Sequence, residues 1–184
     1  MRLPVGLGVA LALLALAQVA TGAPHAARGR YVVPTSAAQT GFGAFREGTG
    51  NDRRALRRAF GRATSTNAHR DNTCTVRWRR LGVTATLGTF GLRRKPCRRG
   101  SFLKARLTKR RWHTPNGVRP GSRRAVARRA AVGRCRPGRC EAPGYILGRH
   151  RSDCAGRAVP SVIAEIHRGR SRVAALVVLS HSCE

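Results

Sequence analysis

The alternation of hydrophobic and polar residues predicts short antiparallel strands in the first half of the chain. Residues 73–81 and 83–90 are rich in β-branched and aromatic residues that favour pleated sheet, and Gly82 separates the two runs. At 103–107, Leu and Ala alternate with Lys and Arg, which indicates a third strand. A fourth short strand is predicted at Trp112.

A short amphipathic helix is predicted ahead of these strands, from Asp52 to the residue before Gly61. Asp52 is placed to accept hydrogen bonds from free N–H groups of the first turn, and Gly61 is typical of a helix end. The apolar face consists of Ala55, Leu56, Ala59 and Phe60. The opposite face consists of Arg53, Arg54, Arg57 and Arg58. Because the apolar face is short, the pattern favours a surface helix that covers a sheet over a membrane-inserted helix.

The same order returns with weaker signals in the second half. Ser122 is predicted to cap a short helix, followed by a strand at 144–150 and a poorly marked strand at 152–157. The last hairpin is the clearest: residues 162–167 alternate, and 173–179 are apolar on both faces. A strand that is apolar on both faces belongs in the middle of the structure, where we expect the two halves to meet.

A repeated motif links the two helices. Phe45, Arg46 and Gly48 lead to Asp52 and the letters RRAL, and about seventy residues later Val118, Arg119 and Gly121 lead to Ser122 and RRAV. The sequence therefore predicts an α+β fold of two tandem units. Each unit has a helical segment packed on a roughly four-stranded antiparallel sheet, with the first at 41–114 and the second at 115–184.

The first residues predict export. A basic start, an uncharged apolar run over residues 5–20 and small residues near the end of the run indicate a signal peptide at 1–23. The run is shorter than a typical transmembrane helix, and an uncleaved anchor or a buried helix is the alternative. Residues 24–40 are mostly small and polar, which predicts a flexible lead. The predicted location is secreted or extracytoplasmic.

The chain has 37 Lys and Arg against 7 Asp and Glu, for a formal net charge of +30. Nearly all of this charge is arginine, which indicates either a genome rich in guanine and cytosine or selection for binding polyanions. The candidate polyanions are nucleic acid, anionic lipid and acidic wall polymer. The predicted anion-binding face consists of Arg53, Arg54, Arg57, Arg58, Arg123, Arg124, Arg128 and Arg129.

Six cysteines in an exported chain predict disulfides. The favoured pairs are Cys74 with Cys97, Cys135 with Cys140, and Cys154 with Cys183. The first pair flanks the first predicted hairpin, the second closes a small loop, and the third flanks the last hairpin. A zinc site of Cys135, Cys140, His150 and Cys154 is the alternative, but an oxidising compartment favours disulfides. No metal and no cofactor is predicted.

Glu165 and His167 lie two residues apart on a predicted strand and so face the same side. With His150 or His181 and a nearby arginine, they are the parts that a small secreted ribonuclease uses. No nucleophile elbow, phosphate loop or metal motif accompanies them, which favours a polar strand face over a catalytic site. No catalytic residue is therefore predicted. Dedicated nucleic-acid binding is disfavoured because aromatic residues are scarce.

Both halves show the same order of elements: a Gly-containing turn, a polar cap, a short helix that ends in a bulky residue and Gly, and an antiparallel sheet. This doubled order resembles the tandem-repeat beta-lactamase inhibitor protein family. It is also similar to outer-membrane assembly lipoproteins of the SmpA/OmlA type. In those families the helices pack on one sheet face, and the other face with its loops meets a protein partner. The lipoprotein cysteine and the inhibitor's acidic and aromatic contact loops are not found here. The resemblance therefore implies an architecture and a binding role, and no functional residue.

The combined expectation is a secreted, disulfide-linked, non-catalytic binding protein with a strongly cationic surface. Its partner is expected to be a protein or an anionic envelope component. The alternatives are a small secreted nuclease and a membrane-active or nucleic-acid-binding cationic protein.

Overall fold

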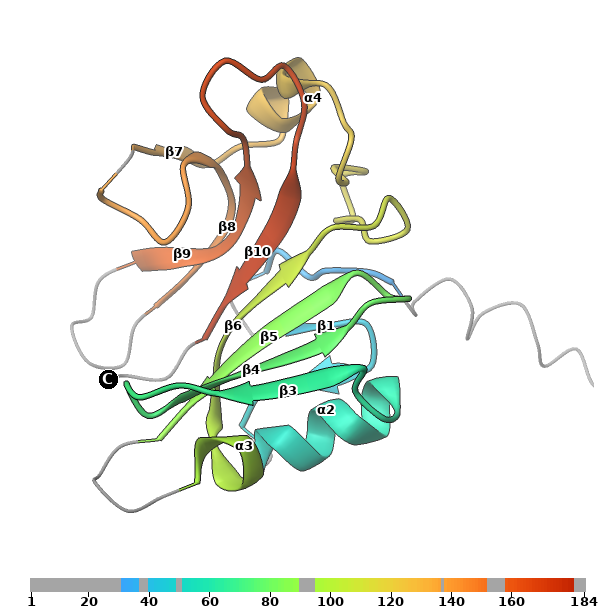
Figure 1. The fold of residues 1–184 in the computed structure, drawn as a ribbon. Helices are drawn as coiled ribbons and strands as arrows, with labels where there is room; N and C mark the ends of the chain where they lie inside the picture. The colour runs from blue at the N-terminus through green and yellow to red at the C-terminus, as the bar shows by residue number, and fades with distance from the viewer. Residues whose placement is uncertain are drawn as a thin grey trace, which may run out of the picture.

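The computed structural model describes residues 31–36, 40–48, 51–89, 95–136, 138–151 and 158–180, so the predicted signal peptide lies outside the described residues. The fold is α+β, with one antiparallel sheet of eight strands in the order β3-β4-β5-β6-β10-β9-β8-β7 (Figure 1). In chain order these strands are β3 (Ser65–Ala68), β4 (Thr73–Trp78), β5 (Val83–Gly88), β6 (Ser101–Leu107), β7 (Gly133–Cys135), β8 (Gly144–Arg151), β9 (Ala158–Glu165) and β10 (Ala175–Leu179). A separate pair, β1 (Gly41–Phe42) and β2 (Phe45–Arg46), precedes the helices α2 (Asp52–Phe60), α3 (Pro96–Arg99) and α4 (Arg124–Arg129).

Helix α2 begins and ends where the sequence predicts, but its cap is different. The N-cap is Asn51, whose side chain accepts a hydrogen bond of 3.0 Å from the N–H of Arg54. Asp52 is buried, with 6% of its surface exposed, and its carboxylate accepts from the N–H of Phe102 in β6 at 2.7 Å. The prediction that Asp52 caps the helix is therefore wrong, because its side chain turns toward the sheet.

Helix α4 also lacks the predicted cap. Its N-cap residue is Arg123, whose side chain makes no capping hydrogen bond. The hydroxyl of Ser122 accepts a hydrogen bond of 3.1 Å from the N–H of Arg119 instead. Ser122 therefore stabilises the turn before the helix, and not the first turn of the helix.

The first half of the sheet has four strands, but its fourth strand is not at Trp112. The fourth strand is β3, an edge strand whose mostly exposed residues carry no hydrophobic pattern. Trp112 directly follows a turn and precedes the isolated bridge of His113 with Val32. Its indole is fully buried and donates a hydrogen bond of 2.7 Å to the carbonyl of Leu81. The aromatic residue Trp112 therefore indicates a side chain that packs in the core here, and not a strand.

Strand β10 lies in the middle of the sheet, as its two-sided apolar pattern predicts. It pairs with β6 on one side, where Leu176 is opposite Leu107, and with β9 on the other, where Leu176 is opposite Ala164. The pair β6–β10 therefore joins the strands of the first half to those of the second. The poorly marked strand predicted at 152–157 lies outside the described residues.

The main core lies between one face of the sheet and the helices. Leu56 of α2 and Ala127 of α4 belong to the same buried cluster as Val76 and Ala105 of the strands. Both helices therefore pack on one face, although Figure 1 shows α2 and α4 at opposite ends of the molecule. A smaller cluster on the other face consists of Cys135, Ala142, Ile146, Ile163 and Val177.

Within the described part of the chain, no helix combines the length and the hydropathy that a membrane crossing requires.

Candidate functional site

A polar surface covers the sheet on the side opposite the main core. Side chains alternate between the two faces of a strand, and residues paired across neighbouring strands share a face. The registers place Thr75 opposite Thr86, and Thr86 opposite Lys104. In the next row Arg77 is opposite Thr84, and Thr84 is opposite Arg106. We call these six residues the open sheet face.

The two ends of this side of the sheet differ in what covers them. Over β8 and β9, Ala142 and the Cys135–Cys140 disulfide pack on Ile146 and Ile163. Over β4, β5 and β6, the six side chains are intermediate or exposed, and the described helices lie on the other face. The open sheet face is therefore accessible within the described part of the chain.

Two ion pairs give the open sheet face a mixed charge. Lys104 pairs with Glu141. Arg106 donates twice to Glu165, from Nε to Oε2 at 2.7 Å and from Nη2 to Oε1 at 3.3 Å. The side chain of Glu165 is only 10% exposed, and this fork holds it in place. A chain with few acidic residues thus places two of them against Lys104 and Arg106, whereas the third basic residue of this face, Arg77, is exposed and forms no ion pair with a described residue.

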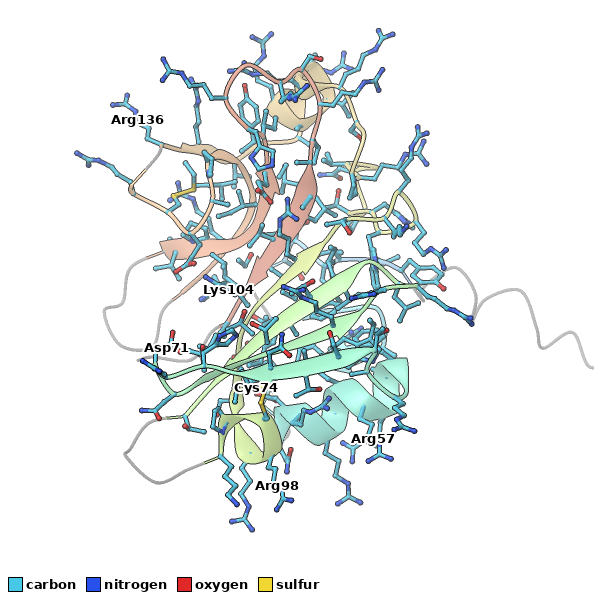
Figure 2. The ribbon with its side chains drawn as sticks, in the orientation of Figure 1. Arg57, Asp71, Cys74, Arg98, Lys104 and Arg136 are labelled. Atoms are coloured by element: carbon cyan, nitrogen blue, oxygen red, sulfur yellow. A yellow bond between two sulfur atoms is a disulfide. The ribbon has the colours of Figure 1, made fainter. Side chains whose placement is uncertain are left out.

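The open sheet face is hollowed where β4, β5, β6 and β10 end on one side. The hollow has a volume of about 450 Å³. Its polar lining consists of Asp71, Thr73, Thr86, Lys104, Glu141 and Ser180, and its apolar lining of Leu103, Val159, Pro160 and Leu179. Figure 2 shows Lys104 over the sheet and Asp71 at the tip of the β3–β4 hairpin. This volume is large enough for one or two amino-acid side chains.

The predicted anion-binding residues fall into two groups. Arg54, Arg57 and Arg58 are exposed on α2, whereas Arg53 is half-buried and its Nε donates to the carbonyl of Cys97 at 3.3 Å. The second group, at α4, consists of Arg123, Arg124, Arg128 and Arg129, all exposed. Because the two helices lie at opposite ends of the molecule, the eight arginines do not form one face (Figure 1).

Helix α3 adds basic residues to the first group. Its side chains Arg98 and Arg99, with the preceding Lys95, are exposed, and α3 contacts α2. Arg57 and Arg98 both point away from the sheet at the same end of the molecule (Figure 2). We call Arg54, Arg57, Arg58, Lys95, Arg98 and Arg99 the α2–α3 basic patch. The predicted anion-binding face did not include the residues from α3, although they lie in a basic run at 93–99 and Cys97 was predicted to bond Cys74.

The two predicted disulfides within the described residues are present. Cys74 bonds Cys97, which attaches α3 to the first hairpin, and Cys135 bonds Cys140. Disulfides fit an extracellular, oxidising location. Cys154 and Cys183 lie outside the described residues.

The structure brings together only some of the residues considered for a ribonuclease site, which were Glu165, His167, His150 or His181, and a nearby arginine. His167 Nε2 lies 3.5 Å from Glu165 Oε1, on the same side as predicted. His150 is opposite Val159, six residues from Glu165 along β9, or about 20 Å at 3.3 Å per residue. His181 lies outside the described residues. The cluster is therefore Glu165, Arg106 and His167, in which Arg106 occupies both oxygens of the carboxylate.

The alternative zinc site is not assembled. Both Cys135 and Cys140 are consumed by their disulfide. Cys135 is opposite Gly144, and His150 lies six residues further along β8, about 20 Å away. No group of three or more metal-ligating side chains occurs among the described residues. The zinc hypothesis is therefore wrong for these residues.

A small hollow of about 230 Å³ lies near α4, and it is lined in part by Arg124, Arg134, Tyr145 and His167. Arg124 Nε donates to the Tyr145 hydroxyl at 3.3 Å. This hydrogen bond is the main cause that lowers the pKa of Tyr145, and the charges of Arg124, Arg134 and Arg128 act in the same direction. The hollow is therefore lined by arginines that favour the deprotonated form of Tyr145.

Comparisons of the chain with protein-family models, with curated proteins and with solved structures found no match. The function is therefore argued from the geometry of these surfaces.

Proposed function

We propose that this chain is a secreted, non-catalytic binding protein that docks a protein partner on the open sheet face. The observation that carries the proposal is the mixed charge of this face on a protein of net charge +30. Lys104 and Arg106 are paired with Glu141 and Glu165, so the face is not simply another cationic surface. A surface that carries charges of both signs suits a protein partner better than a polyanion, because a polyanion carries charge of only one sign.

The side chains of the open sheet face favour binding without a large loss of entropy. Thr75, Thr84 and Thr86 are short and β-branched, so few rotamers are lost when a partner covers them. The fork between Arg106 and Glu165 already holds two charged groups in one arrangement. The adjacent hollow of about 450 Å³ offers a pocket for an anchoring side chain of the partner.

We further infer that the sheet consists of two related units. In one unit α2 precedes β3, β4, β5 and β6, and in the other α4 precedes β7, β8, β9 and β10. The sheet order places the last strands of the two units side by side and the first strands at the two edges. This symmetric order, with both helices on one face, supports the repeat motif as the origin of the fold.

The test uses the mature protein with intact disulfides as bait for proteins from the exterior of the producing cell, at high salt. Thr75→Tyr combined with Thr86→Tyr adds bulk to the open sheet face without changing charge. The matched control is Thr66→Tyr, an exposed position on the adjacent edge strand whose register partner, Val76, faces the core. We expect a saturable complex that the double variant loses and the control retains. Retention by both variants, or release of all bound protein by salt, contradicts the proposal.

A second candidate function is polyanion binding by the α2–α3 basic patch. Its six basic residues are exposed, and none of them forms an ion pair with another described residue. This binding is expected to weaken steeply as salt rises. Arg57→Gln with Arg98→Gln is expected to reduce the slope of log affinity against log salt for single-stranded DNA by about 1 to 2. An unchanged slope argues against this patch as the site.

A further inference from the structure

A second hollow lies at the end of α2, away from the open sheet face, with a volume of about 750 Å³. Three parts of the chain form it: the last turn of α2 with the segment that follows it as far as Thr64, the turn after β4, and Tyr31 with Ala44 from the N-terminal segment. The N–H of Arg79 donates to Thr64 Oγ1 at 3.1 Å, which ties two of these walls together. The size is that of a small-molecule site.

The floor of this hollow is apolar. It includes Phe60 and Trp78, whose rings meet edge to face with centroids 5.7 Å apart. The Trp78 Nε1–H donates to the carbonyl of Gly61 at 3.1 Å, so the indole has no free donor to present. Leu81 and Ala59 extend the apolar surface. A ligand that enters this hollow therefore buries a hydrocarbon or aromatic body.

The rim is positively charged. The hollow is lined by four exposed arginines: Arg58, Arg62, Arg79 and Arg80. None of the described residues that line it is acidic. Within the described chain none of the four guanidinium groups forms an ion pair. Guanidinium groups recognise carboxylates and phosphates by paired N–H donors, and an adjacent apolar wall strengthens that attraction.

We propose that this hollow binds a single-chain amphiphile with an anionic headgroup, such as a fatty carboxylate or an alkyl phosphate. The alkyl chain lies on Phe60 and Leu81, with the nearly fully buried Trp78 beneath them, and the headgroup is bound by the arginines of the rim. The apolar floor and the arginine rim together favour an anionic amphiphile over a neutral lipid, because a neutral lipid forms no ion pair with the arginines. The same combination favours an anionic amphiphile over an inorganic anion, because an inorganic anion leaves the apolar floor exposed to water.

The test measures binding of dodecanoate, below its micelle concentration and at physiological salt, by Trp fluorescence and calorimetry. We expect saturable binding of one molecule per chain. Dodecyl glucoside, which has the same chain without charge, and inorganic phosphate are each expected to bind at least about tenfold more weakly. Dodecyl phosphate, compared with dodecanoate, reports which headgroup the rim prefers.

Two variants assign the binding to this hollow. Arg58→Gln with Arg79→Gln removes half of the rim charge and is expected to weaken dodecanoate binding about tenfold. Arg136→Gln with Arg139→Gln makes the same change at exposed positions near the Cys135–Cys140 disulfide, outside the hollow, and is expected to alter the affinity less than about twofold. Ala44→Phe, at an exposed lining position, is expected to weaken binding by filling the hollow. Equal affinity for dodecyl glucoside, or equal effects of the two arginine pairs, overturns the proposal. These outcomes are independent of whether the open sheet face binds a protein.

Discussion

The carboxylate of Asp52, at the start of α2, accepts a hydrogen bond of 2.7 Å from the backbone N–H of Phe102 in β6, 50 residues later in the chain. Phe102 is fully buried, and it lies beside the irregularity in the β5–β6 pairing between Thr86 and Leu87. A backbone N–H at such an irregularity needs another acceptor, and Asp52 supplies it. This bond fixes the first turn of the helix against the sheet.

Asp52→Ala is expected to lower the free energy of unfolding by about 2 kcal/mol, because the N–H of Phe102 is then buried without a partner. Urea unfolding followed by circular dichroism measures the change. Asn51→Ala removes the more exposed cap of the same helix and is expected to cost about 1 kcal/mol. If Asp52→Ala lowers the free energy of unfolding no more than Asn51→Ala does, the bond from Phe102 to Asp52 stabilises the protein no more than the Asn51 cap.

Asp52 also predicts a dependence of stability on pH. Burial raises the pKa of Asp52 above its ordinary value near 3.8, and the hydrogen bond from Phe102 only partly opposes this. The folded state therefore keeps this proton at a pH where the unfolded state has lost it. The contribution to stability is fully present below the ordinary pKa and is lost as pH rises through the raised folded pKa.

Comparison with Asp52→Asn isolates this contribution. The stability of the wild type minus that of the variant is expected to fall as pH rises through the window between the two pKa values. Urea unfolding at a series of pH values across that window measures the difference. Carboxylates that do not interact with Asp52 cancel in the subtraction, and repulsion from Glu47 raises the pKa of Asp52 in the same direction as burial. A difference that stays constant or rises with pH therefore contradicts the assignment to Asp52.

The two disulfides are expected to contribute unequally. Cys74–Cys97 spans 23 residues and Cys135–Cys140 spans 5. If constraint of the unfolded chain dominates, replacing the first pair with Ala lowers the free energy of unfolding by about 3 kcal/mol and the second by about 2 kcal/mol. Loss of the first pair also releases α3 from β4. The basic residues of α3, which belong to the α2–α3 basic patch, then become more mobile. Limited proteolysis detects this change as faster cleavage near Lys95. Equal proteolysis of the two variants argues against this role.

Gly144 and Gly169 differ in the space that surrounds their Cα atoms, so the same substitution can be compared at the two positions. A Cβ at Gly144 meets the carbonyl oxygen of Ala164 at 2.0 Å, whereas a Cβ at Gly169 meets nothing within 4 Å. Gly169→Ala is expected to cost about 1 kcal/mol for its positive φ alone. Gly144→Ala is expected to cost more than twice that amount, because β8 and β9 must separate there. Thermal unfolding of the two variants gives the comparison, and equal shifts in Tm contradict the close approach.

The cluster of Glu165, Arg106 and His167 gives a test of the ribonuclease alternative. Because both oxygens of Glu165 are bonded to Arg106, we expect this carboxylate to act as a structural partner and not as a general base. The purified protein is expected to release no RNA fragments beyond those released by His167→Ala prepared in parallel. Hydrolysis that His167→Ala abolishes and Arg106→Gln alters supports the nuclease instead.

Much of the fold follows from local patterns. Helix α2 and strands β4, β5, β6 and β10 occur where hydrophobic periodicity places them, because their core-facing side chains recur at the period of the element. Strand β3 and the short β7 carry no such period. They are edge strands held by backbone pairing with β4 and β8, and backbone pairing leaves little trace in the residue types.

The candidate sites were less predictable than the fold. Glu165 and His167 were predicted to share a side from their spacing, but the fork from Arg106 depends on the order β6-β10-β9, which spacing does not reveal. The hollow at the end of α2 joins Tyr31, Phe60 and Trp78, which lie in separate parts of the sequence. No local pattern marks residues that meet only after folding.

The sequence by itself determined the α+β class, the positive charge, two of the disulfides and the apolar strand that occupies the middle of the sheet. These properties depend on residue type and on spacing along the chain. The tertiary structure alone decided that Glu141 and Glu165 pair with two of the three basic residues of the open sheet face, and that α2 and α4 carry their arginines to opposite ends. The reason is that charge pairing and surface shape depend on contacts between distant residues, which strand order and register set.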